Sequence, residues 1–134
     1  MVDKTANVLM ATGRRKEAVA RVRVRQEGTG KITVNGRDYL AYFPSVDQRM
    51  QVRKPLITAA METKLDIMAN VCGGGICGQA GAISLGISRC ILAMQPETRS
   101  ILRKNSLLTR DPRTRERKKY GRKGARRRFQ WTKR

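Results

Sequence analysis

Charge divides this chain into two unequal parts and limits which of them can fold. Residues 103–134 contain fifteen Lys and Arg against two acidic residues, whereas residues 1–102 contain fifteen against eight. A segment with so much charge and so few apolar residues cannot bury enough surface to offset the entropy lost on folding. The sequence therefore predicts a boundary near Asn105, with a globular domain over residues 1–105 and an extended basic tail over residues 106–134.

The formal net charge of +20 indicates a polyanionic partner, because such a chain repels itself unless its charge is neutralised. A membrane surface would require a long apolar run or a helix with one basic and one apolar face, and we find neither in the sequence. We therefore expect nucleic acid, and no membrane, as the partner. Residues 1–10 lack the apolar core of a signal peptide, which favours a cytoplasmic location.

The cysteine and histidine content argues against a metal site and against catalysis. Cys72, Cys77 and Cys90 form no CxxC pair, and the chain has no histidine to complete a mixed zinc site. We expect three reduced, mostly buried thiols, no metal and no cofactor. Histidine is also the commonest general acid or base, so its absence favours a protein that is not an enzyme.

Alternating residues predict the first strands of the globular part. Residues 18–25 place small apolar side chains on one face and Arg21, Arg23 and Arg25 on the other. Residues 28–30 read Gly-Thr-Gly, a turn signal, and residues 31–34 resume the alternation, so we expect an antiparallel hairpin from these two segments. An earlier strand is expected around Met10.

Apolar spacing predicts the helices that follow. Asp47 is a candidate cap for a helix in which Pro55 either makes a kink or begins a second piece. Residues 65–71 alternate as a strand, and residues 78–95 carry apolar side chains at helical spacing. Gly86 lies in the middle of this helix, where it costs about 1 kcal/mol relative to Ala, so we expect close packing against its backbone.

The segment Gly73-x-Gly75-x-x-Gly78 matches the dinucleotide fingerprint between a predicted strand and a predicted helix. The context fails, because Glu97, at the right distance for the ribose contact, follows a proline that begins a helix instead of ending a strand. A nucleotide-binding enzyme is therefore a weak alternative. Glycine backbone at a helix start can still approach an RNA phosphate. Tight packing of strand on helix explains the same glycines equally well.

Two basic segments are candidate RNA contacts. Arg14, Arg15 and Lys16 lie together beside Gly13, just before the strand at residues 18–25, and in a chain of this charge they favour a phosphate contact. The tail combines arginines, which form bidentate phosphate contacts, with Tyr120, Phe129 and Trp131, on which bases can stack. Fully extended, residues 118–134 would span roughly 50 to 60 Å, farther than the diameter of the domain.

Five motifs in order resemble one family, the bacterial form of ribosomal protein nine of the small subunit. They cover the chain from about residue 8 to residue 134. The motifs are GRRKEAVARV at residues 13–22, ITVNGR at 32–37, GGGxxGQAGA at 73–82, LTRDPR at 108–113 and ERKKYG at 116–121.

The resemblance implies an α/β fold of two layers: a mostly antiparallel four-stranded sheet backed by helices, with a left-handed βαβ crossover, plus the extended tail. It implies a place in the head of the small subunit, bound to small-subunit ribosomal RNA and neighbouring ribosomal proteins. We expect a structural protein of the cytoplasmic ribosome that is not a homo-oligomer. An organellar ribosome remains open.

Site residues follow from the motifs and the resemblance together. The expected ribosomal RNA contacts are Arg14, Arg15, Lys16, Gly73, Gly74, Gly75, Gln79, Arg110, Arg113, Arg117, Lys118, Lys119, Tyr120, Arg122, Lys123, Arg126 and Arg127. The resemblance implies that the end of the tail touches the anticodon stem-loop of the P-site transfer RNA through Lys133 and Arg134, and we expect Arg128 to contact the same transfer RNA.

Two points qualify the resemblance. Arg128-Phe129 stands where Ala-Pro is usual in the family, which changes the stiffness of the tail there. An alternative is an RNA-binding protein like the protein subunit of ribonuclease P, which shares the fold and the unusual crossover. That alternative expects its RNA contacts on a basic helix and a cleft in the globular part, whereas here the charge is concentrated in the tail.

Overall fold

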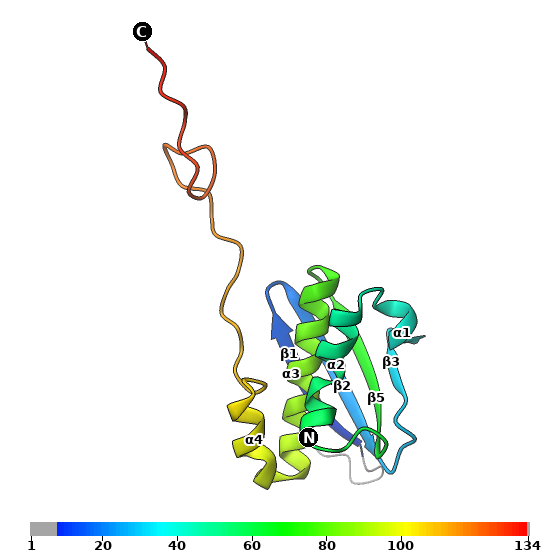
Figure 1. Cartoon of the computed structure of the whole chain (residues 1–134). Coiled ribbons are helices and arrows are strands. Elements are labelled where there is room, and N and C mark those ends of the chain that lie inside the picture. Colours follow the sequence, from blue (N-terminus) through cyan, green and yellow to red (C-terminus); the bar gives the residue numbers. More distant parts are fainter. Residues whose placement is uncertain (1–7, 134) are drawn as a thin grey trace.

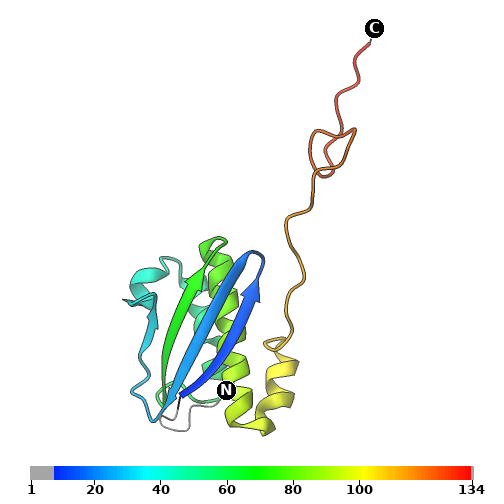
Figure 2. The same ribbon diagram turned by 180° about the vertical axis from the view of Figure 1, so that it is seen from behind.

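The computed structural model describes residues 8–133, and it contains one five-stranded sheet with helices on a single face (Figures 1 and 2). The sheet and the longest helix share one apolar core. The elements are, in order, β1 (Val8–Arg15), β2 (Ala18–Gln26), β3 (Ile32–Val34), β4 (Arg37–Asp38), α1 (Tyr39–Tyr42), α2 (Val46–Thr58), β5 (Leu65–Cys72), α3 (Ile76–Met94), η1 (Pro96–Thr98) and α4 (Arg99–Lys104).

The sheet is mixed and has the strand order β1-β2-β5-β3-β4. The pairs β1–β2, β2–β5 and β3–β4 are antiparallel, whereas β3 and β5 are parallel. The expected sheet had four strands. The fifth, β4, forms because Asn35 and Gly36 both have positive φ, which is the requirement of a tight two-residue hairpin turn.

The hairpin expected between residues 18–25 and 31–34 is wrong. β2 pairs with β1 on one side and with β5 on the other, so β5 separates β2 from β3. The Gly-Thr-Gly segment instead wraps around the start of β5, where one carboxylate oxygen of Asp66 accepts hydrogen bonds from the backbone N–H groups of Thr29 (2.7 Å) and Lys31 (3.1 Å). A long-range partner therefore replaces the local pairing.

α3 is the core helix, and most of its residues from Gly78 to Ile91 are buried. The close packing expected at Gly86 is confirmed, since a Cβ atom built there would lie 2.5 Å from Val22 Cγ2. By length and composition α3 is also apolar enough to cross a membrane, so the statement that the chain lacks a long apolar run is wrong. Two thirds of that stretch is buried in the fold, as in the core helix of a soluble protein.

α2 lies beside α3 on the same face of the sheet (Figure 1). Its N-cap is Ser45, and Asp47 lies in the first turn, so the expected cap is displaced by two residues. Pro55 lies inside the helix and does not begin a second piece. Pro55 lacks the N–H that would donate to the Gln51 carbonyl, and its ring is fully buried.

The three thiols differ in exposure. Cys90 is buried, whereas Cys72 and Cys77 are exposed, so the expectation of mostly buried cysteines is wrong for two of them. Cys72 follows buried Val71 and points to the opposite face of β5, and Cys77 lies in the first turn of α3.

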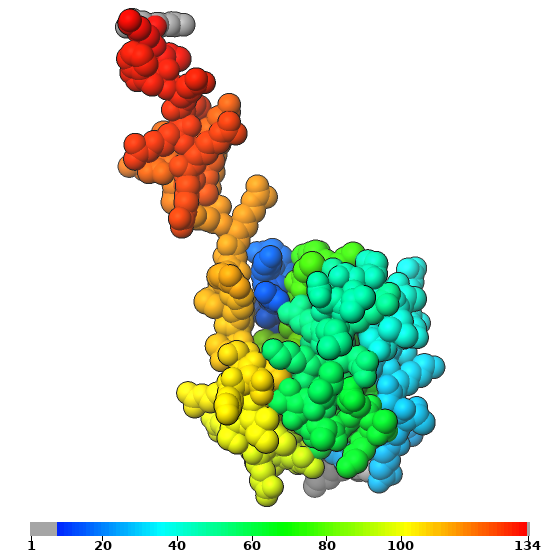
Figure 3. Space-filling view, viewed as in Figure 1, coloured from blue at the N-terminus to red at the C-terminus, as the bar shows by residue number. Residues whose placement is uncertain are grey.

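The chain leaves the core after α4. Ser106 has positive φ, and Leu107, whose N–H donates to the carbonyl of Leu102, is buried against the core. Between Lys104 and residue 133 the structure contains no further helix or strand. This segment passes along one side of the globular part and then extends away from it (Figure 3). The core thus reaches Leu107, two residues beyond the expected boundary, which stays a prediction.

Candidate nucleic-acid interface

The turn between β1 and β2 presents the first basic cluster. Arg14 and Lys16 are exposed, and Lys16 has a φ of +51°, which turns the chain sharply. Arg15 differs from its neighbours, because its side chain lies across Gly81 of α3, where no Cβ atom blocks it. The turn therefore offers two free cations to a ligand and directs the third inward.

Glycines join this turn to α3. Gly73 and Gly74 have positive φ, and Cβ atoms on them would lie 2.5 Å from the Glu17 carbonyl oxygen and 2.9 Å from the Ala18 nitrogen. Positive φ and close backbone contacts therefore explain why glycine occupies positions 73 and 74. Gly75 has open space around it and is the N-cap of α3, so its backbone remains accessible to an anion.

Gln79 fixes the loop to the rest of the domain. Its side-chain amide donates to the Gly73 carbonyl (3.1 Å) and accepts from the Tyr42 hydroxyl (2.8 Å). The RNA contact expected of Gln79 stays a prediction, because each of its amide atoms makes one hydrogen bond within the protein and can form another. Gln79 holds the glycine loop against α1 and α3.

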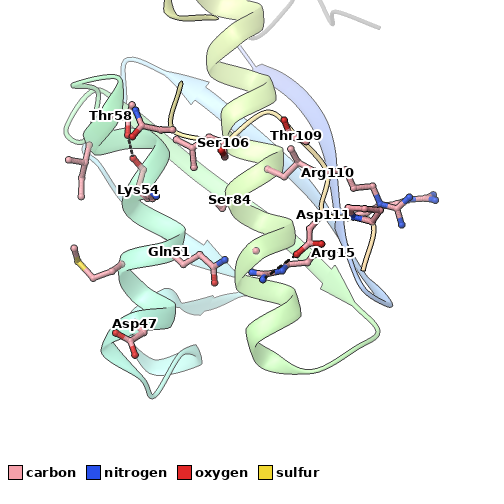
Figure 4. A pocket seen from close by; sticks show the side chains of 18 residues that line it. Arg15, Asp47, Gln51, Lys54, Thr58, Ser84, Ser106, Thr109, Arg110 and Asp111 are labelled. Carbon is pink, nitrogen blue, oxygen red and sulfur yellow. Dashed lines mark hydrogen bonds and ion pairs between the residues drawn. The ribbon is translucent and has the colours of Figure 1, made fainter. Parts of the chain in front are cut away.

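A groove of about 940 Å³ lies between α2, α3 and the segment after α4 (Figure 4). Met50 and Ile57 line its α2 wall, and Leu85 and Leu107 contribute apolar surface on the other sides. Arg15 and Asp111 lie at one end with their side chains directed toward one another. The groove is therefore mainly apolar. Arg15 and Asp111 place charges at the end where the tail begins, and Asp47 and Lys54 place charges along the α2 wall.

Asp111 connects the start of the tail to the globular part through ion pairs. It forms an ion pair with Arg113 (2.8 Å) and lies 3.7 Å from Arg15 Nη2. Hydrogen bonds from the side chain and backbone of Arg113 lower the pKa of Asp111 far below its usual value, and the charge of Arg15 adds to the effect. Arg15 and Arg113, both expected to contact RNA, are thus brought together by a carboxylate.

Glu116 organises a second part of the tail. Its two carboxylate oxygens pair with Arg126 (2.9 Å) and Lys119 (3.3 Å), and these contacts lower the pKa of Glu116. The backbone N–H of Lys123 also donates to the Arg127 carbonyl (2.9 Å). Residues 116–127 consequently form a loop in the tail, visible in Figure 1.

Most of the remaining tail side chains are exposed. Tyr120 is 98% exposed and Trp131 is 80% exposed, so their rings are free for stacking. The exposed tail cations from the expected site are Arg110, Arg113, Arg117, Lys118, Lys123, Arg126, Arg127, Arg128 and Lys133. Arg122 is half-buried, with its guanidinium donating to the Arg126 carbonyl, and Arg134 lies outside the described residues.

Sequence reasoning missed the two carboxylates that shape the tail. Asp111 and Glu116 are the only acidic residues after residue 102, and this isolation among cations is the signal that could have identified them. It also left Arg21, Arg23 and Arg25 out of the expected site, although their alternation with buried residues already indicated a cationic sheet face.

Comparison with known proteins gives a consistent result. The family model described as ribosomal protein S9/S16 matches residues 13–134. The protein called small ribosomal subunit protein uS9 of Treponema pallidum is 52% identical over 128 residues, covering 96% of this chain and 98% of its own length. Its namesakes in Maridesulfovibrio salexigens and Anaeromyxobacter sp. (strain K) are 55% and 53% identical, covering 92% and 93% of this chain and 95% of their own lengths.

Proposed function

This chain belongs to the ribosomal protein S9/S16 family, and from that premise we propose that it binds small-subunit ribosomal RNA in the head of the subunit. The family is a structural, non-enzymatic component of the ribosome, so RNA binding and a role in translation follow from membership. In this proposal the protein is cytoplasmic within the ribosome, contacts neighbouring ribosomal proteins and does not form homo-oligomers. Membership leaves the ribonuclease P-like alternative without support.

The exposed cations of the tail carry the proposal. Residues 108–133 place arginines and lysines along a backbone without helix or strand, outside the core and open to solvent. Such a segment gains order from phosphates that neutralise it, since it cannot gain order from apolar burial. The ribosomal RNA contacts proposed here are those of the β1–β2 turn, the glycine loop and the tail up to Arg127.

The end of the tail has a more specific role in this proposal. Lys133 and Arg134 contact the anticodon stem-loop of the P-site transfer RNA, as the family resemblance implies, and Arg128 adds a further cation to this contact. The globular part then serves as the anchor, and the loop at residues 116–127 lies between the anchor and the end of the tail. Arg128 and Phe129 lie just after this loop, where the family usually has Ala-Pro.

The connection between β3 and β5 is also part of the proposal. The two strands are parallel and adjacent, and α1 and α2 lie between them in the sequence. The family resemblance implies that this βαβ crossover is left-handed, against the strong general preference for right-handed connections. An experimental structure in which the crossover is right-handed would remove this part of the proposal.

The test distinguishes the role of the globular part in binding the subunit from the role of the tail end in contacting transfer RNA. We would delete Lys133 and Arg134, and compare a control with the same charge change, Arg103→Gln with Lys104→Gln on α4. Both variants should sediment with small subunits in a sucrose gradient. Only the deletion should weaken P-site transfer RNA retention by isolated subunits. Equal retention in both variants would overturn the transfer RNA contact, and failure of the wild-type chain to sediment with small subunits would overturn the ribosomal assignment.

A further inference from the structure

The face of the sheet away from the helices is uncovered. Figure 2 shows β1, β2 and β5 from this side with no described helix or loop across them. Residues alternate along β2, so that Ala20, Val22 and Val24 are buried while the intervening residues are exposed. A sheet face left open in this way remains available to a partner.

Four arginines form a row on this outer face. Arg21, Arg23 and Arg25 follow one another at every second position of β2, the middle strand of the three, about 6.6 to 6.8 Å apart. Arg14 of β1 lies on the same face, because it pairs with Val19, two residues before Arg21. The row therefore extends from the β1–β2 turn along the length of the sheet.

These arginines have no ion-pair partner within the part of the chain that the structure describes. Asp66 lies across from Arg25 in the register with β5, but its carboxylate is held by the backbone N–H groups of Thr29 and Lys31. The other neighbours of the row on this face are neutral. Asp66 keeps its negative charge beside Arg25, so the uncompensated positive charge lies at Arg14, Arg21 and Arg23.

The neighbours of the row indicate which partner fits. Met10 and Met68 flank Arg23 on the adjacent strands and are 54% and 55% exposed, while Thr12 and Asn70 flank Arg21. No aromatic side chain lies on the described outer face of these strands, so bases cannot stack on it as they do on sheet faces that read RNA sequence. A protein interface would have an apolar centre, and here arginines separate the two methionines.

We propose that this outer face, centred on Arg21, Arg23 and Arg25, binds the sugar-phosphate backbone of RNA. Guanidinium groups spaced along a strand contact phosphate oxygens in two-pronged hydrogen bonds, and the flanking hydroxyl and amide groups supply further donors. Recognition by such a surface is independent of base sequence. The inference rests on the proposed function in taking ribosomal RNA as the ligand, and it adds a second face to the contacts of the turn and the tail.

The test uses the full chain with Arg21→Thr, Arg23→Thr and Arg25→Thr. Threonine keeps the β propensity of the strand, and circular dichroism and thermal unfolding check the fold of each variant. The control removes the same charge from α4, which is not part of the outer sheet face, with Arg99→Gln, Arg103→Gln and Lys104→Gln, and glutamine keeps helix propensity. The probe is small-subunit ribosomal RNA, and its Kd is measured between about 50 and 200 mM salt.

We expect the threonine variant to bind more weakly and to lose about 2 to 3 units of the slope of log Kd against log salt, because three phosphate contacts disappear. The control should lose less than one unit. Equal slopes for the two variants would overturn the inference. A second outcome would also overturn the inference: the threonine variant binds the RNA normally but is missing from assembled small subunits. That outcome would favour an acidic protein as the partner of the outer face. Failure of the proposed function is distinguishable, since the wild-type chain itself would then not bind this RNA.

Discussion

Gly13 of β1 lies directly against Gly86 of α3, and a Cβ atom on Gly13 would lie only 2.6 Å from the Gly86 backbone nitrogen. α3 can therefore approach the sheet at backbone distance. The contact explains why a residue that weakens an isolated helix stands in the middle of the most buried one.

Gly86→Ala should destabilise the domain, although Gly→Ala inside a helix normally stabilises. The new methyl group would meet Val22, and overpacking of about 1 to 3 kcal/mol exceeds the helix-propensity gain of about 1 kcal/mol. We expect a net loss of up to about 2 kcal/mol in urea unfolding. Gly13→Ala should cost more, because it meets the backbone of α3. Gly78→Ala is the control, because Gly78 lies in the same helix and a Cβ atom there would meet only ordinary contacts at 3.5 Å or more. A stabilising Gly86→Ala would contradict the packing.

Asp66→Ala should lower the unfolding temperature, because the backbone N–H groups of Thr29 and Lys31 lose their acceptor at the start of β5. Asp66→Asn keeps an oxygen at this position and should be milder. The two variants together separate the hydrogen bonds from the charge. Equal loss in both would show that the charge, and not the acceptor geometry, holds the segment.

The same carboxylate predicts a dependence on acid. Hydrogen bonds from Lys31 and Thr29 lower the pKa of Asp66, so its contribution is complete above the unfolded pKa near 3.9 and is lost as the pH falls through the lower folded value. Below about pH 4, the free energy of unfolding should fall less steeply with acid in Asp66→Asn than in the wild type. Parallel pH profiles for the two proteins would disprove this linkage.

Glu116→Gln should open the loop at residues 116–127. The neutral side chain loses its ion pairs with Lys119 and Arg126, so the Lys123 N–H should exchange with solvent a few-fold faster. Exposed ion pairs are weak, which is why the effect is small and confined to the loop. Glu97→Gln in η1 is the control. Unchanged exchange at Lys123 would mean that Glu116 does not order the loop.

Thiol labelling should distinguish the three cysteines. Burial raises the pKa of Cys90 to about 12, whereas Cys72 and Cys77 are exposed. Because the thiolate is the reactive form, iodoacetamide at pH 8 should add two groups to the native protein and three to the unfolded protein, counted by mass spectrometry. The double variant Cys72→Ser with Cys77→Ser should remain unlabelled while folded. Rapid labelling of that variant would show that Cys90 is accessible.

Local pattern was sufficient for some elements and insufficient for others. The alternation of apolar residues around Val22 identified β2, and the helical spacing of apolar residues around Gly86 identified α3. Both patterns arise because an element that is buried on one face has apolar residues at its own period. The turn at residues 28–30 was read as a hairpin because sequence neighbours usually pair. The predicted pairing of β2 with β3 is wrong because β5, some forty residues later, lies between them. Strand order depends on contacts between residues far apart in the sequence, which a local pattern does not include.

The candidate site shows the same contrast. Composition alone indicated that the cations of the tail are exposed, because a segment with so few apolar residues cannot form a core that buries them. The inward direction of Arg15 and the internal hydrogen bonds of Gln79 depend on the position of α3 and α1, which the sequence does not reveal. Cys72 was misjudged because the preference of cysteine for burial is a statistical average, whereas its exposure follows from the parity of its position on β5.

The burial of Leu107 gives the tail a fixed origin on the globular part. With this origin, residue 134 stays within roughly 100 Å of Leu107 even at full extension. Once the globular part is bound, any target inside that radius experiences the tail end as a tethered ligand, at an effective concentration that can approach the millimolar range. Contacts at the tip can therefore be individually weak and quickly broken, yet occupied for much of the time.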